Sequence, residues 1–110
     1  MSDATNYFLR MGIPDFIVGF DFLMDAMELA NNDVTLLRKL TKELYPQIAE
    51  KNGTTWQHVE RGIRFAIETA WDRGDDDFHE KVFGYSYSRT RGRPSNGEFI
   101  SRSYHYLAGK

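Results

Sequence analysis

The chain has no cysteine and only three prolines among its 110 residues. Without cysteine it can form no disulfide, no thiolate zinc site and no cysteine nucleophile, and a reducing cytoplasm is the natural compartment. It also lacks any apolar run near the roughly 20 residues that cross a bilayer. Its first residues, MSDATNYFLR, lack the basic and apolar regions of a signal peptide. We therefore expect a soluble, cytoplasmic protein without a membrane segment.

The composition that remains is sufficient for one hydrophobic core. The chain is 41% hydrophobic and 15% aromatic, and its length suits one compact domain but not two. We expect a single domain over residues 1–110.

The net charge of −2 is unevenly distributed along the chain. Up to Ser88, 9 Lys and Arg accompany 15 Asp and Glu, which gives −6, whereas from Arg89 onward 5 accompany 1, which gives +4. A basic tail on an acidic body indicates a local anionic partner. A solvated tail that is basic for solubility explains the same distribution equally well.

Turn and capping residues divide the chain into helices, and we expect an all-α bundle of six helices. A short helix from Ser2 or Asp3 ends at Gly12, and Pro14 suits the first turn of a second helix over about 15–30. The core stripe of this second helix is predicted to contain Phe16, Phe20, Leu23, Met27 and Ala30.

Two further capping signals bound the next helical segments. Asp33 can cap a helix that Pro46 breaks or restarts before the residues QIAEKN. Ser95 and Glu98 form a capping box before the last helix. The residues of these segments that are predicted to face inward are Leu36, Leu37, Leu40, Leu44, Phe99, Ile100, Tyr104 and Leu107.

The clearest amphipathic pattern lies between Thr54 and Gly74. The dipeptide NG precedes it, and Thr54 with Gln57 has the form of a capping box. The buried arc is predicted to contain Trp56, Val59, Ile63, Ala66, Ile67, Ala70 and Trp71. The opposite face presents Gln57, His58, Arg61, Arg64, Phe65 and Glu68. Gly62 is costly within a helix, by roughly 1 kcal/mol relative to alanine, which indicates either close packing against a neighbour or a glycine that is simply tolerated.

The segment LYPQIAEKNGTTWQHVERGIRFAIETAW has the form of a helix-turn-helix. On its outer face, Arg61 can donate to guanine, Glu60 can accept from cytosine and Phe65 can pack on a thymine methyl. His58 can donate to a base or a phosphate. The predicted DNA-binding residues of this helix are Gln57, His58, Glu60, Arg61, Arg64 and Phe65. The competing interpretation is that the charges form ordinary exposed helix pairs and that Phe65 marks a protein contact.

The stretch RTRGRP places Arg89, Arg91 and Arg93 in alternation with small residues. Such a layout can straddle phosphates and reach into a minor groove without sequence specificity. A flexible basic loop is the alternative interpretation. We predict that these three arginines contact DNA.

An acidic run, Asp75 to Asp77, is followed by His79 and Glu80. The run lacks the glycine and the distal glutamate of a calcium loop, and carboxylates at a helix start interact favourably with the helix dipole. We predict a helix cap here and no metal site. The chain also has no glycine-rich phosphate loop or nucleophile elbow, so we expect no cofactor and no enzymatic activity.

Three segments together resemble a known family: GIPDFIVGFDFLMDAM, TKELYPQIAEKNGTTWQHVERGIRFAIETAWDRG and FGYSYSRTRGRPSNGEFI. They are similar to the C-terminal DNA-binding effector domain of the stage zero sporulation response regulator, the master regulator of sporulation initiation. The resemblance runs from about Tyr7 to Ile100. It implies a six-helix fold whose helix-turn-helix enters the major groove of GTCGAA-like boxes, with two domains head to tail on tandem boxes.

Carried over by position, the resemblance assigns roles to particular residues. Glu60 and Arg61 match base-reading residues, and Arg64 matches a phosphate or base contact. Arg91 and Arg93 match lysines of the family's basic loop. The segment that matches a surface for an RNA polymerase sigma factor includes Phe78, Val82, Phe83, Gly84, Tyr85 and Ser86.

The departures from the family pattern predict altered or relaxed specificity. His58 stands where the family usually has a base-reading arginine, Trp56 where it has a small residue, and Phe65 where it has histidine. The last helix is shorter and more polar than in the family, which places the head-to-tail contact in question. The family's receiver domain would lie before the matched segment, and residues 1–110 contain no such domain. We therefore expect a receiver-less form, which is either a free-standing relative or an effector domain separated from its receiver. An alternative function is a protein-interaction module that modulates a full-length regulator or a sigma factor without strong DNA reading.

Overall fold

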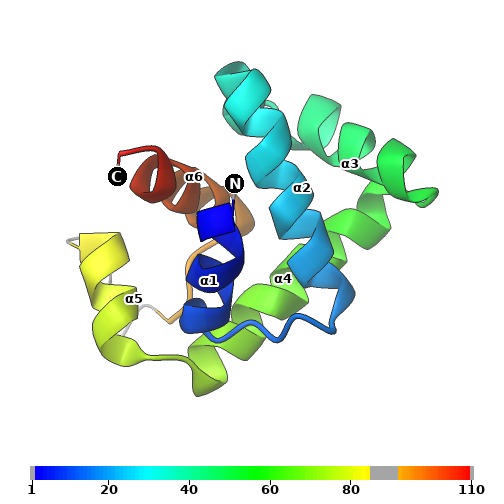
Figure 1. Ribbon diagram of the computed structural model, residues 1–110. Helices are drawn as coiled ribbons and strands as arrows, with labels where there is room; N and C mark the ends of the chain where they lie inside the picture. Colours follow the sequence, from blue (N-terminus) through cyan, green and yellow to red (C-terminus); the bar gives the residue numbers. More distant parts are fainter. Residues whose placement is uncertain (1, 85–91, 110) are drawn as a thin grey trace.

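The computed structural model describes residues 2–84 and 92–109, and their regular structure is entirely helical (Figure 1). The α-helices are α1 (Ser2–Met11), α2 (Val18–Asn32), α3 (Tyr45–Asn52), α4 (Trp56–Arg73), α5 (Asp76–Phe83) and α6 (Asn96–Ala108). A 3₁₀ turn, η1 (Val34–Arg38), and a π turn, η2 (Leu40–Leu44), separate α2 from α3. The expected all-α fold with six α-helices is confirmed. None of these helices combines the length and apolarity that a bilayer span requires.

The core forms around α2, which contacts α1, α4 and α6 (Figure 1). Four residues of its predicted stripe are buried, namely Phe20, Leu23, Met27 and Ala30, and Phe22 and Ala26 are buried as well. Because both sides of α2 meet other helices, its buried arc is wider than a surface helix would show.

The two ends of the described chain meet in the core. The hydroxyl of Tyr7 in α1 donates to Ser103 Oγ in α6 at 2.8 Å, and both residues are buried. Burial raises the pKa of Tyr7 well above its ordinary value. The ring of Phe8 stacks on that of Phe99 at 6.2 Å between centroids. These contacts join α1 to α6 across almost the whole length of the sequence.

The predicted start of the second helix is wrong. α2 begins at Val18, so Pro14 lies in the preceding segment and not in a first helical turn. Phe16 is 83% exposed and is not a core residue. The reason is tertiary: Ile13 is 1% exposed and occupies the core. The chain then turns at Asp15 and Phe16, and the extended backbone of Ile17 (φ −95, ψ 148) precedes the first helical residue.

The leucine segment after Asp33 was predicted to be one helix, whereas the structure has the two short turns η1 and η2 there. Asp33 does cap it, since its carboxylate accepts from the N–H of Thr35 at 3.1 Å. Lys39 has a non-helical backbone (φ −134, ψ 51) that separates η1 from η2. Leu36 and Leu44 are buried, whereas the other two leucines are partly exposed. Pro46 lies at the first turn of α3, where its missing N–H costs nothing, so the predicted restart of a helix at this proline is confirmed.

Candidate nucleic-acid interface

A three-residue turn joins α3 to α4 and sets where α4 begins. Gly53 has φ 64 and ψ 39, a left-handed conformation that glycine adopts without strain. The N–H of Thr54 donates to the carbonyl of Ala49 at 2.9 Å and closes the end of α3. Thr55 is then the N-cap, because its hydroxyl accepts from the N–H three residues on at 3.1 Å. The predicted capping box of Thr54 and Gln57 is therefore wrong.

The amphipathic pattern of α4 is confirmed. The buried residues are Val59, Ile63, Ala66, Ile67 and Ala70, and the two tryptophans at its ends are partly buried. The residues exposed on the opposite face are Gln57, His58, Arg61, Arg64 and Phe65, with Glu60 at its edge. One face of α4 is anchored in the core while the other presents the predicted DNA-binding side chains to solvent.

The charged groups on this face differ in their partners. Arg64 Nη2 lies 3.3 Å from Glu60 Oε1, one helical turn away. Arg61 forms neither an ion pair nor a side-chain hydrogen bond with any residue in the described part of the chain. Exposed pairs contribute little, typically ~1 kcal/mol or less, so a ligand can displace Glu60 from Arg64. Arg61 needs no such displacement.

α4 is seated on α2 through two glycines. A Cβ atom on Gly19 would lie 2.3 Å from the carbonyl oxygen of Gly62 and 2.8 Å from Ala66 Cβ. A Cβ atom on Gly62 would lie 3.0 Å from the ring of Phe22. The close packing predicted from Gly62 is confirmed. Its partner Gly19 was missed, although a glycine inside a helical pattern was the signal that could have found it.

The exposed imidazole of His58 is supported by α2. Its ring meets the ring of Phe22 edge-on, with 5.7 Å between centroids and an interplanar angle of 86°. Because this contact occupies one side of His58, the residue has less freedom than a fully solvated histidine.

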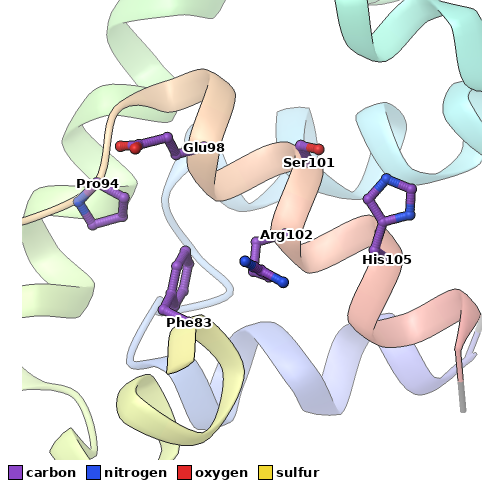
Figure 2. A pocket seen from close by; sticks show the side chains of 6 residues that line it. All are labelled: Phe83, Pro94, Glu98, Ser101, Arg102 and His105. Atoms are coloured by element: carbon purple, nitrogen blue, oxygen red, sulfur yellow. The ribbon is translucent and has the colours of Figure 1, made fainter. Parts of the chain in front are cut away.

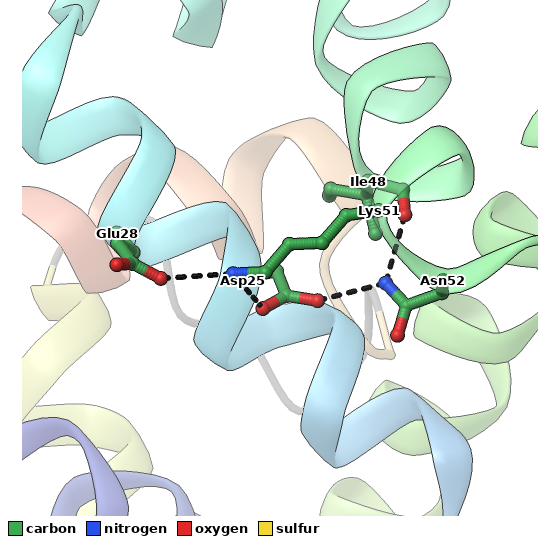
Figure 3. A network of polar contacts seen from close by, with 5 residues as sticks. All are labelled: Asp25, Glu28, Ile48, Lys51 and Asn52. Atoms are coloured by element: carbon green, nitrogen blue, oxygen red, sulfur yellow. Dashed lines mark hydrogen bonds and ion pairs between the residues drawn. The ribbon is translucent and has the colours of Figure 1, made fainter.

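A polar network ties the end of α3 to α2 (Figure 3). Lys51 Nζ lies 3.0 Å from Asp25 Oδ1 and 3.0 Å from Glu28 Oε1. Asn52 Nδ2 donates to Asp25 Oδ2 at 2.9 Å and to the carbonyl of Ile48 at 2.8 Å. Asp25 therefore holds both residues that lead into the turn before α4. The pattern of the sequence did not reveal these partners.

The basic loop reaches α4 at its described end. Arg93 Nη2 donates to Glu68 Oε2 on α4 at 3.0 Å. Asn96 Nδ2 donates to the carbonyl of Glu60 at 3.1 Å and to the hydroxyl of Tyr45 at 3.2 Å. Burial raises the pKa of the Tyr45 hydroxyl. Arg89 and Arg91 lie outside the described residues.

An open groove of about 800 Å³ lies between α4, η2 and the start of α6. Arg64 and Arg93 both line it, together with Glu60, Tyr45 and Asn96. The groove thus brings one arginine of the presented helix together with one arginine of the loop.

Of the residues predicted to contact a sigma factor, three of the four that the structure describes are core residues. Phe78, Val82 and Phe83 are 3%, 5% and 3% exposed, so their side chains face inward. Gly84 is exposed. The remaining two residues of the prediction, Tyr85 and Ser86, lie outside the described range. The surface that α5 offers to a partner therefore comes mainly from its other residues.

A smaller hollow of about 340 Å³ separates the end of α5 from α6 (Figure 2). The ring of Phe83 forms one wall, and Arg102 and His105 of α6 stand across from it. The hollow continues toward Pro94 at the start of the last helix.

The acidic run caps α5 as predicted, and His79, which follows the run in the sequence, is a core residue. Asp75 Oδ1 accepts from the N–H groups of Asp77 and Phe78. His79 is fully buried, its Nε2 lies 2.8 Å from the carbonyl of Met11, and its ring stacks on Trp71 with 4.0 Å between centroids. His79 precedes the buried Val82 and Phe83 by three and four residues, and this helical spacing was the signal in the sequence that could have predicted its burial.

The all-α fold, together with a match to a known family, defines a helical DNA-binding domain of the transcription-regulator class. Residues 4–107 match the family described as "Sporulation initiation factor Spo0A C terminal". Because the match covers nearly the whole chain, the chain belongs to this family of DNA-binding effector domains of a sporulation regulator.

Proposed function

We propose that this chain is a sequence-specific transcription regulator in which α3 and α4 form the DNA-reading helix-turn-helix. α4 enters the major groove of a box related to GTCGAA, and Arg61 donates to a guanine. One observation carries the proposal: Arg61 is exposed on a firmly anchored helix and has no partner among the described residues. A bidentate contact of this kind provides roughly 1–3 kcal/mol of discrimination.

The other presented side chains have supporting roles. Glu60 accepts from cytosine, and Gln57 and His58 lie at the start of α4, the end that enters the groove in this class of motif. Phe65 packs on a thymine methyl. Since His58 and Phe65 depart from the family pattern, the preferred box differs from the family's. On tandem boxes two chains bind head to tail.

Phosphate contacts come from the groove beside α4. Arg64 and Arg93 line it, and Arg89 and Arg91 extend the basic loop. Contacts of this kind increase affinity for any duplex and weaken as salt rises.

The test is fluorescence anisotropy with a duplex that contains GTCGAA and with a scrambled duplex, each over a salt series. Specific binding predicts a difference between the duplexes that persists in salt, whereas two curves that fall together would contradict base reading. Arg61→Ala should weaken binding to the box by about 5- to 150-fold. Arg73→Ala, which removes an exposed arginine at the other end of α4, is the matched control and should change binding little.

A second function, a module that binds a full-length regulator or a sigma factor, is favoured by exposed apolar side chains. Phe16, Phe65 and Val18 are 83%, 56% and 44% exposed. A Cβ atom on Gly62 would lie 3.5 Å from Val18 Cγ1, which places the start of α2 beside the turn of α4 that precedes Phe65. A sigma factor would also meet the exposed residues of α5.

This second function is tested by co-purification of the chain with each partner. Phe16→Ser and Phe65→Ser should release the partner and leave the fold intact, because both side chains are exposed. Retention of the partner by both variants would contradict a role for these rings.

A further inference from the structure

One arginine that faces the proposed DNA surface is already paired with an acid from α4. Arg93 Nη2 and Glu68 Oε2 lie 3.0 Å apart, and the two side chains are 50% and 38% exposed. Glu68 is one turn beyond Arg64 on the same helix. The pair therefore stands at the edge of the groove that Arg64 and Arg93 line.

A carboxylate and a phosphate compete for the same guanidinium donors, because both accept hydrogen bonds in the same planar geometry. A phosphate that approaches Arg93 must displace Glu68 and then remains near its negative charge. The pair is exposed and thus weak enough to be displaced. The ion pair nevertheless lowers the net free energy that a phosphate contact of Arg93 contributes to DNA binding.

We propose that Glu68 restrains the binding of Arg93 to the backbone phosphates of duplex DNA. The inference rests on the proposed DNA-binding function and adds a residue that limits sequence-independent affinity. Arg61, which carries the proposed base contact, has no such acid partner in the described chain. Glu68 therefore weakens the contacts common to every duplex and leaves the base contact unopposed.

The alternative role for Glu68 is to hold the loop in position. Other contacts already anchor the start of α6. Asn96 Nδ2 bonds to the carbonyl of Glu60 and to the hydroxyl of Tyr45, and Ser95 and Glu98 form a capping box with bonds of 2.9 and 3.1 Å. Loss of the pair between Glu68 and Arg93 leaves these bonds in place.

The experiment measures the affinity of Glu68→Gln for the scrambled duplex by anisotropy over a salt series. We expect binding about 1.5- to 5-fold tighter than that of the unaltered chain. The slope of log K against log salt should become steeper by up to about 0.9, since one more cation is free to meet a phosphate.

The matched control is Glu28→Gln. It removes the same charge and an ion pair of the same length, 3.0 Å to Lys51 Nζ, on the surface of α2 and α3. Lys51 keeps its second partner, Asp25, so the fold is preserved. The proposal is supported if Glu68→Gln increases the affinity for the scrambled duplex more than Glu28→Gln does, and if this increase disappears when Arg93→Gln is also present.

Unchanged or weaker binding by Glu68→Gln overturns it, because Glu68 would then orient Arg93 toward DNA or have no effect. If the unaltered chain binds the GTCGAA duplex more tightly than the scrambled duplex and Glu68→Gln shows no increase in affinity, this inference fails and the proposed function stands. If no variant binds either duplex, both fail.

Discussion

Replacing Gly19 by alanine is expected to push α2 away from α4. The new methyl would lie 2.3 Å from the carbonyl oxygen of Gly62 and 2.8 Å from Ala66 Cβ, whereas ordinary contacts begin near 3.4 Å. The shortfall at the carbonyl is about 1 Å. Both neighbouring atoms belong to the body of α4, so no side-chain rotation can relieve the overlap.

The size of the effect follows from two opposing terms. Overpacking in a close-packed interior typically costs about 1–3 kcal/mol, and the rigid neighbours favour the upper end. Alanine is better than glycine within a helix by about 1 kcal/mol, which offsets part of this cost. We expect the free energy of unfolding to fall by about 2 kcal/mol, equivalent to about 8 °C in Tm for a domain of this size.

Urea unfolding followed by circular dichroism measures this change, with Gly62→Ala as the comparison. The methyl on Gly62 would lie 3.0 Å from the ring of Phe22, which can shift, so the net change there should stay within about 1 kcal/mol. A Gly19→Ala variant as stable as the unaltered chain, or no more destabilised than Gly62→Ala, would refute the reasoning. Because α4 is seated on α2 at this point, Gly19→Ala should also weaken binding to the GTCGAA duplex.

Two further predictions concern local features. Thr55→Ala should lower the free energy of unfolding by about 1 kcal/mol, because α4 loses its N-cap. Thr54→Ala retains the backbone N–H bond to α3 and should lower the free energy of unfolding less in the same urea titration. A larger loss in Thr54→Ala than in Thr55→Ala would indicate that Thr54 is the N-cap. Tyr7→Phe should cost about 1 kcal/mol at pH 7 because Ser103 loses its buried partner. Burial raises the pKa of Tyr7 above its ordinary 10.0. The contribution of the neutral Tyr7 to the free energy of unfolding is therefore present below pH 10 and is lost as the pH rises. Urea titrations at pH 7 and above pH 10 should therefore show a smaller alkaline loss in Tyr7→Phe than in the unaltered chain, and an equal loss would count against this assignment.

The positions of most helices could be predicted because their signals are local. The side chains of Asp33, Asp75 and Ser95 each accept from backbone N–H groups within three residues. A short stretch of sequence therefore contains both the donor and the acceptor of each helix cap. Helical periodicity separated the buried and presented faces of α4 for the same reason.

The errors occurred where a distant contact overrides the local pattern. Pro14 and Phe16 fit a helix start, but Ile13 is buried in the core. The chain turns after it, and α2 begins only at Val18. The leucines after Asp33 have helical spacing, but the backbone breaks at Lys39. Neither outcome is encoded within one or two turns of sequence.

The sequence by itself determined the helical class, the presented face of α4 and the exposure of Arg61, because each follows from periodicity and capping within one helix. Only the tertiary structure decided which groups meet across helices. Glu68 with Arg93, Gly19 with Gly62 and His79 with Trp71 are brought together by chain folding. Each of these contacts joins residues of two different elements, and local pattern carries no information about such pairs, since the packing of the whole core selects them.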